Sequence, residues 1–126
     1  MKLPQTVRGI FLSLPALLTF LALSGLALAG DLSGEYTCKG KYLKDEYGGK
    51  VTITKKGDSY AIAWDLGDSK HEGWAVEESG VLAVSFKGSD GTGVCAYKVS
   101  EDGKKLDGKW SYVDGAGDGT EVLTKP

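Results

Sequence analysis

The stretch Tyr60-Ala61-Ile62-Ala63-Trp64 shows most clearly how this chain is organised. Its large residues at positions 60, 62 and 64 alternate with alanines, and this period of two predicts a strand with one heavy face and one light face. The turn residues Asp65-Leu66-Gly67-Asp68-Ser69 follow, and a second strand begins near Glu72. The chain after residue 30 repeats this plan of a short strand and a turn rich in Gly and Asp.

The repeated plan predicts eight short strands. Tight turns such as Asp102-Gly103 connect them, so strands that are neighbours in sequence are expected to pair in space. Pairing the first strand with the eighth removes both free edges. We therefore predict an all-β, eight-stranded antiparallel up-and-down barrel without a C-terminal helix, whose interior is filled by side chains or holds one small ligand. The expected strands cover about 34–43, 47–55, 59–65, 70–77, 81–87, 92–100, 105–113 and 120–125.

The first 29 residues differ from the rest of the chain. Two basic residues, Lys2 and Arg8, come before an apolar run that ends in Ala27-Leu28-Ala29. This ending matches the small-x-small pattern of a signal cleavage site. The alternative is an uncleaved membrane anchor, because the run is nearly long enough to span a bilayer. A proline and a glycine inside the run favour cleavage. We predict a secretory signal peptide over 1–29, one barrel domain over 30–126, a secreted or periplasmic location, and no membrane attachment after cleavage.

Charge and cysteine content narrow the class of partner. Without Lys2 and Arg8, thirteen basic and seventeen acidic residues leave a net charge of −4, so we expect no binding to nucleic acid or to anionic lipid. Cys38 and Cys95 would enter an oxidising compartment, where a disulfide between them is the default expectation. His71 is the sole histidine and no Cys-x-x-Cys spacing occurs, so we expect no metal and no cofactor.

Large aromatic residues recur along the predicted strands. They could line a ligand cavity together with a few polar groups, or fill the core of a domain too small to leave space. A Cys38–Cys95 bond would favour a filled core, because it would draw together walls that otherwise stand about 10 Å apart. The candidate residues that line the ligand site or the core are Tyr36, Tyr60, Trp64, Trp74, Tyr97, Trp110, Tyr112 and Glu121.

The charged residues on these strands give no pattern of catalysis. Glu121 and Glu72 are each either an inward polar anchor or a solvated charge at the rim; solvation is favoured for Glu72, whereas the last strand does not show which face Glu121 takes. His71 beside Asp68 suggests acid/base chemistry, but no nucleophile accompanies it and a surface histidine is favoured. The acidic loop 114–118 lacks the spacing of a Ca²⁺-binding loop. We expect no catalytic residue and no enzymatic activity.

Glycines and aromatics recur at regular spacing in Gly34-Glu35-Tyr36-Thr37-Cys38, Tyr47-Gly48-Gly49-Lys50-Val51, Ser59-Tyr60 to Trp64, Leu106-Asp107-Gly108-Lys109-Trp110 and Gly119-Thr120-Glu121. This pattern resembles that of small secreted bacterial proteins, some of them labelled fibronectin-binding. The Leu-x-Gly-x-aromatic strand openings, at residues 32–36 and 106–110, also resemble avidin-like and lipocalin-like barrels. Each such glycine is expected to mark a bend or a place where a neighbouring ring packs on bare backbone.

The segment Tyr36-Thr37-Cys38-Lys39-Gly40 is similar to the start of the periplasmic inhibitors of C-type lysozyme, although their Ser-Gly-x-x-Tyr loop and C-terminal cysteine are absent. The resemblances imply a non-enzymatic protein that binds a host or envelope protein, such as extracellular matrix, through its outer surface. The alternatives are a barrel that holds a small apolar ligand and, third, an inhibitor of a secreted enzyme. A cavity would favour the small ligand, and an exposed aromatic patch over a filled core would favour the protein partner.

Overall fold

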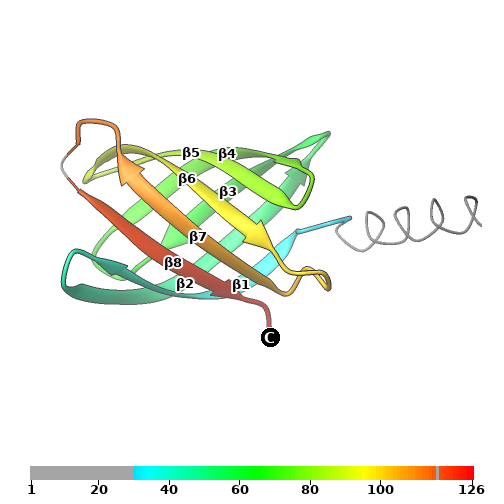
Figure 1. The fold of residues 1–126 in the computed structure, drawn as a ribbon, viewed down its shortest axis with the longest axis horizontal. Coiled ribbons are helices and arrows are strands. Elements are labelled where there is room, and N and C mark those ends of the chain that lie inside the picture. The colour runs from blue at the N-terminus through cyan, green and yellow to red at the C-terminus, as the bar shows by residue number, and fades with distance from the viewer. Residues whose placement is uncertain (1–29, 116) are drawn as a thin grey trace, which may run out of the picture.

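The structure, a computed structural model, describes residues 30–115 and 117–126; the predicted signal peptide lies outside them. Eight antiparallel strands pair in chain order and close into a barrel, because β1 also pairs with β8 (Figure 1). This confirms the predicted fold class. The strands are β1 (Gly34–Tyr42), β2 (Asp45–Lys56), β3 (Ser59–Asp65), β4 (Lys70–Glu78), β5 (Val81–Gly88), β6 (Gly91–Val99), β7 (Lys105–Tyr112) and β8 (Asp118–Thr124). Within these described ranges, no helix is long and apolar enough to cross a membrane.

Two strands, β2 and β8, begin two residues earlier than the sequence predicts. Strand β2 starts at Asp45, which pairs with Tyr42 across a two-residue turn. Leu43 makes this turn possible by adopting φ +58°, a conformation that non-glycine residues rarely take. Strand β8 starts at Asp118 because its pairing with β7 extends to Ser111.

Side chains alternate between the barrel interior and solvent along most of the strands, as the period of two predicts. In β3 the buried residues are Tyr60, Ile62 and Trp64. In β5 they are Leu82, Val84 and Phe86. The interior is therefore built from one face of each strand, while the outer face mixes lysines and carboxylates with threonines and small or apolar residues.

The segment before β1 closes one end of the barrel. Leu32 is buried there, and its backbone is held by two tyrosines: Tyr36 Oη donates to the Leu32 carbonyl at 2.7 Å, and the Leu32 amide donates to Tyr60 Oη at 3.3 Å. Tyr60 Oη also donates to the carbonyl of Gly30 at 3.1 Å. Figure 1 shows this segment in cyan, at the opposite end of the barrel from the β7–β8 connection. One end is thus sealed by an apolar plug.

Strand β4 corrects two predictions about single residues. Trp74, predicted to line the interior, is 63% exposed on the outer face, whereas His71, predicted to lie at the surface, is buried. The inward positions of β4 are His71, Gly73 and Ala75, so Trp74 falls on the other face of the pleat. Gly73 leaves its interior space to the ring of Trp64, which would lie 3.1 Å from a Cβ at that position. Glu72 is exposed, as expected.

Rings inside the barrel lie over glycines of the neighbouring strand. At Gly108, a Cβ would lie 2.5 Å from Cδ1 of Tyr97, so only a glycine permits the observed approach. The expected role of Gly108 in the Leu-x-Gly-x-aromatic pattern is therefore confirmed, whereas at Gly34 the close neighbour is the Lys125 side chain. The register pairs that share this arrangement are Tyr47 with Gly40, His71 with Gly88, Phe86 with Gly93, Tyr97 with Gly108 and Trp110 with Gly119.

Candidate functional site

A buried carboxylate lies at the centre of the barrel. Glu121 on β8 is 4% exposed and points inward. It is therefore the inward polar anchor, and not the solvated rim charge, of the two alternatives that the sequence left open. Its Oε1 accepts a hydrogen bond from Tyr47 Oη at 2.7 Å, and its Oε2 accepts one from Trp64 Nε1 at 2.9 Å. Tyr97 Oη also donates to Oε2. Three donors from three strands therefore converge on one side chain.

The strand register explains how two of these donors reach Glu121. On β7, Gly108 pairs with both Tyr97 and Glu121, and on β1, Gly40 pairs with both Tyr47 and Glu121. The five residues form one row across β6, β7, β8, β1 and β2, in the order Tyr-Gly-Glu-Gly-Tyr. Each tyrosine ring lies over the glycine beside it, so its hydroxyl extends to the carboxylate.

The other two members of the network come from β3 and β7. Trp64 reaches Glu121 from β3, which pairs with neither β8 nor its neighbours, so this hydrogen bond crosses the barrel. Trp110 Nε1 donates to Tyr47 Oη at 2.9 Å, and Tyr47 in turn donates to Glu121. Hydrogen bonds to a charged group are stronger than neutral ones, so the network holds opposite walls in one arrangement.

All groups bonded to Glu121 donate, so both of its oxygens act as acceptors. Burial, and then the negative charge of Glu121, raise the pKa of Tyr47 and of Tyr97 well above the ordinary range of a phenol. Both hydroxyls therefore keep their protons and remain donors at neutral pH. The carboxylate of Glu121 is therefore surrounded by neutral donors at the centre of the barrel.

Above this network, the end of the barrel opposite Leu32 contains an open cavity of about 290 Å³. Glu121, Trp64 and Cys95 contribute to its inner part, while turn residues such as Asp68 and Asp90 line its mouth. This volume lies close to the lower limit of about 300 Å³ for small-molecule sites. The aromatic side chains that line the cavity are Tyr42, Tyr47, Trp64, Phe86, Trp110 and Tyr112.

The aromatic rings of the cavity contact one another in a continuous group. Trp110 stacks on Tyr42 with ring centroids 5.2 Å apart and meets Tyr112 edge-on at 5.2 Å. Phe86 links this group to Trp64, with centroids 5.9 Å apart. Such edge and stacked contacts fix the orientation of each ring. The wall of the cavity is therefore rigid and largely apolar.

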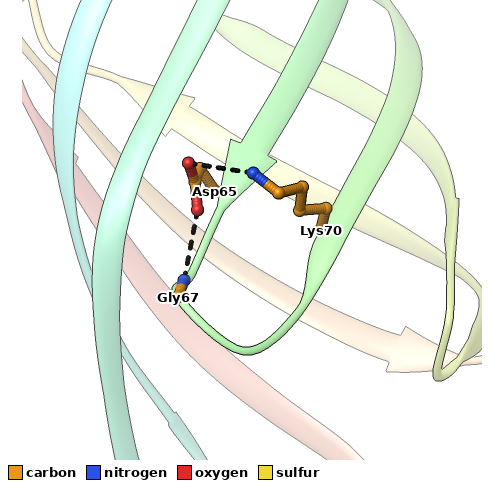
Figure 2. Close-up of polar contacts among 3 residues, drawn as sticks. All are labelled: Asp65, Gly67 and Lys70. Atoms are coloured by element: carbon orange, nitrogen blue, oxygen red, sulfur yellow. Dashed lines mark hydrogen bonds and ion pairs between the residues drawn. The ribbon is translucent and has the colours of Figure 1, made fainter.

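The β3–β4 hairpin forms part of the mouth and is held by its own polar contacts (Figure 2). Asp65 Oδ1 accepts a hydrogen bond from the Gly67 amide at 3.2 Å, and Asp65 Oδ2 pairs with Lys70 Nζ at 3.2 Å. The Gly67 amide first, and then Lys70, hold the pKa of Asp65 below its ordinary value. The hairpin thus places Leu66 and Asp68 at the mouth, while the Lys70 charge is paired with Asp65.

His71 lines the cavity wall with an unusual lack of partners. Its Nε2 lies 3.8 Å from Asp90 Oδ2, and its Nδ1 is buried without a hydrogen-bond partner in the described structure. Its ring meets Phe86 edge-on, with centroids 5.9 Å apart. Buried polar atoms are nearly always hydrogen-bonded, so the enclosed Nδ1 is an exception within the described structure.

The two cysteines do not form the predicted disulfide; both are buried free thiols. Cys38 lies on β1 and Cys95 on β6, and neither strand pairs with the other. Burial and then the charge of Glu121 raise the pKa of both thiols, that of Cys95 to about 12. Barrel closure, rather than a covalent bond, therefore joins these walls. Over the described residues, no group of three or more His, Cys, Asp and Glu side chains is placed to hold a metal ion.

The residues predicted to line a ligand site or the core lie in different parts of the structure. Tyr36 and Tyr60 belong to the closed end, Trp74 lies outside, and Tyr97 is part of the network below the cavity. The residues that line the cavity are Trp64, Trp110, Tyr112 and Glu121. The sequence analysis missed Tyr47, Phe86 and His71 as site residues. The glycines under these three rings, Gly40, Gly93 and Gly88, lie on paired strands, so no local run of sequence marks them.

Neither a family model nor a curated protein sequence matches the chain. Among solved structures, the chain is similar to a de novo designed fluorescence-activating β-barrel, with a TM-score of 0.56 and 13% sequence identity over 75% of this chain and 93% of the designed one. At this identity the similarity concerns the fold alone.

Proposed function

We propose that this protein is a non-enzymatic binding protein that holds a small, largely apolar molecule in the open mouth of its barrel. The observation that carries the proposal is the cavity of about 290 Å³ above the Glu121 network. Ligand sites are typically concave and mostly apolar, with a few placed polar groups that fix orientation. Glu121 and His71 are such groups, set among six aromatic side chains.

The contrast between the two ends of the barrel supports this proposal. Leu32 seals one end with an apolar side chain, so a ligand has no entrance at that end. The other end keeps a cavity although the chain is short and a filled interior would bury more apolar surface. Apolar side chains at the cavity positions would stabilise the fold, so the open space is a feature that binding would explain.

Native mass spectrometry of the protein purified from its source cells tests the proposal. We expect a small molecule that stays bound under native conditions and leaves on unfolding. Ser69→Phe, which adds a ring at the mouth, should reduce occupancy, whereas Ser85→Phe on the outer face should not. In a Trp74→Phe variant the remaining tryptophans, Trp64 and Trp110, both line the cavity, so their fluorescence reports on a bound aromatic compound. The proposal would be contradicted if the native mass were that of the bare protein and if small aromatic compounds left this fluorescence unchanged.

A second candidate function is favoured by one observation on the outer face. Trp74 is 63% exposed and stands in one register row with Ser85 and the exposed Val94, while the exposed Val76 lies two residues along β4. Tryptophan is enriched at protein interfaces and among the residues that contribute most to binding. This outer apolar patch (Trp74, Val76 and Val94) supports the protein partner that the fibronectin-binding resemblance implies.

Surface plasmon resonance on immobilised fibronectin tests this second candidate. Trp74→Ser should lower the response at least about tenfold, as expected for an interface hot spot. Val113→Ser, which changes an equally exposed apolar residue elsewhere, should leave the response unchanged. Equal responses from both variants would exclude the outer apolar patch as the contact surface.

A further inference from the structure

We infer that the cavity selects an organic cation, a small molecule with an aromatic or apolar body and an ammonium group. The inference rests on the proposed function of binding in the barrel mouth. Its first basis is the charge of the lining. Four carboxylates face the cavity, Asp45, Asp68, Asp90 and Glu121, and no lysine or arginine does so within the described chain.

The position of these charges favours a cation with one charged end. Glu121 lies at the inner end of the cavity and is 4% exposed, and the groups bonded to it are neutral donors. A buried charge without an opposite charge is costly, and a ligand cation would supply the missing partner. The aspartates at the mouth add to the negative potential, which a cleft with apolar walls focuses and which attracts cations from solution.

The aromatic lining provides a second, separate attraction for the same ligand class. Trp64, Phe86 and Trp110 surround the space above Glu121, with centroids about 6 Å from ring to ring. The face of an aromatic ring carries negative potential, so a cation within about 6 Å of a ring is stabilised, most strongly by tryptophan. An anion of the same shape would be repelled by both the rings and the carboxylates.

His71 adds one polar side chain to the cavity wall. The side chain is 9% exposed and lines the cavity, and its Nε2 lies 3.8 Å from Asp90 Oδ2 at the mouth. Its Nδ1 is enclosed and has no hydrogen-bond partner in the described structure. Selectivity for a cation therefore comes from the carboxylates and the aromatic rings of the lining.

Isothermal titration calorimetry with three matched probes tests the inference. Phenethylamine, 2-phenylethanol and 3-phenylpropionate share an aromatic ring and a two-carbon chain but end in a cation, a neutral hydroxyl and an anion. At pH 7 we expect phenethylamine to bind on the order of tenfold more tightly than the alcohol, with the carboxylate weakest. Binding of the alcohol or the carboxylate as tightly as the amine would overturn the inference but leave the proposed function standing. No binding of any probe would overturn both.

Variants locate the source of the selectivity. Glu121→Gln and the double variant Asp45→Asn/Asp90→Asn should each lower the ratio of amine to alcohol affinity severalfold, whereas Asp107→Asn, on the outer face, should leave it unchanged. The double variant changes only exposed carboxylates, so it keeps the test valid if Glu121→Gln fails to fold. An unchanged ratio in the folded cavity variants would show that the carboxylates do not select the ligand.

Discussion

The hydroxyl of Tyr97 donates a hydrogen bond to Glu121 across the bare backbone of Gly108, which pairs with both residues from the strand between them. The ring lies over the glycine because a Cβ there would stand 2.5 Å from Cδ1 of Tyr97. A glycine that contributes no side chain thus positions a hydrogen bond between its two neighbours. The same arrangement recurs at Gly40, between Tyr47 and Glu121.

Removal of the central carboxylate should destabilise the barrel. Glu121→Ala leaves three buried donors without their acceptor, so the free energy of unfolding should fall by roughly 3 kcal/mol or more. Glu121→Gln retains one acceptor oxygen and should lose less. Urea denaturation measures both changes. Glu72→Gln, on the outer face, is the matched control and should stay within about 0.5 kcal/mol of the parent protein.

Addition of one methyl group at Gly108 should disturb Tyr97. Gly108→Ala forces the ring away from β7, and the resulting strain should cost about 1–3 kcal/mol of stability. A double-mutant cycle with Tyr97→Leu separates this cause from a general intolerance of alanine. The cost of Gly108→Ala should be smaller in the Tyr97→Leu background; equal costs in both backgrounds would show that the ring is not the cause.

The two cysteines should resist alkylation in the folded protein. Cys38 and Cys95 are buried, and the raised pKa of each thiol leaves almost no thiolate at pH 8. Iodoacetamide should therefore add to neither residue under native conditions and to both in denaturing urea, as read by intact mass. A mass two hydrogens below that of the reduced protein would contradict the free thiols seen in the structure.

Stability should decline at alkaline pH. Burial raises the pKa of Cys95 from 9.0 to about 12 and that of Tyr36 from 10.0 to about 12. The unfolded chain therefore releases these protons at a pH where the folded chain still holds them, so stability is complete below about pH 9 and is lost progressively as pH rises toward about 12. Urea midpoints from pH 7 to 11 measure this loss.

A variant identifies which groups begin the alkaline decline. Cys38→Ala/Cys95→Ala removes the groups with the lower ordinary pKa and leaves the buried tyrosines, so the onset should move from about pH 9 to about pH 10. A midpoint that stays constant up to pH 11 in the parent protein would contradict the burial of these side chains.

The strand plan and the closure of the barrel follow from local patterns in the chain. Alternation in Tyr60-Ala61-Ile62-Ala63-Trp64 places its large residues inside, and short turns leave hairpin pairing as the simple connection. Local spacing specifies these features, because the period of a strand and the length of a turn depend on neighbours in sequence. On β4 the prediction that Trp74 points inward has the wrong phase, because Gly73 and Ala75 occupy the inward face.

The candidate site, in contrast, depends on contacts that form only when the barrel closes. The row that joins Tyr97, Glu121 and Tyr47 depends on the register of five strands, and no local pattern shows which residues meet across a closed sheet. The cavity likewise depends on which end of the barrel Leu32 seals. The thiols of Cys38 and Cys95 stay free on two strands that do not pair with each other. Contacts between residues 24 to 74 positions apart bring the network together, so its chemistry follows from closure of the barrel.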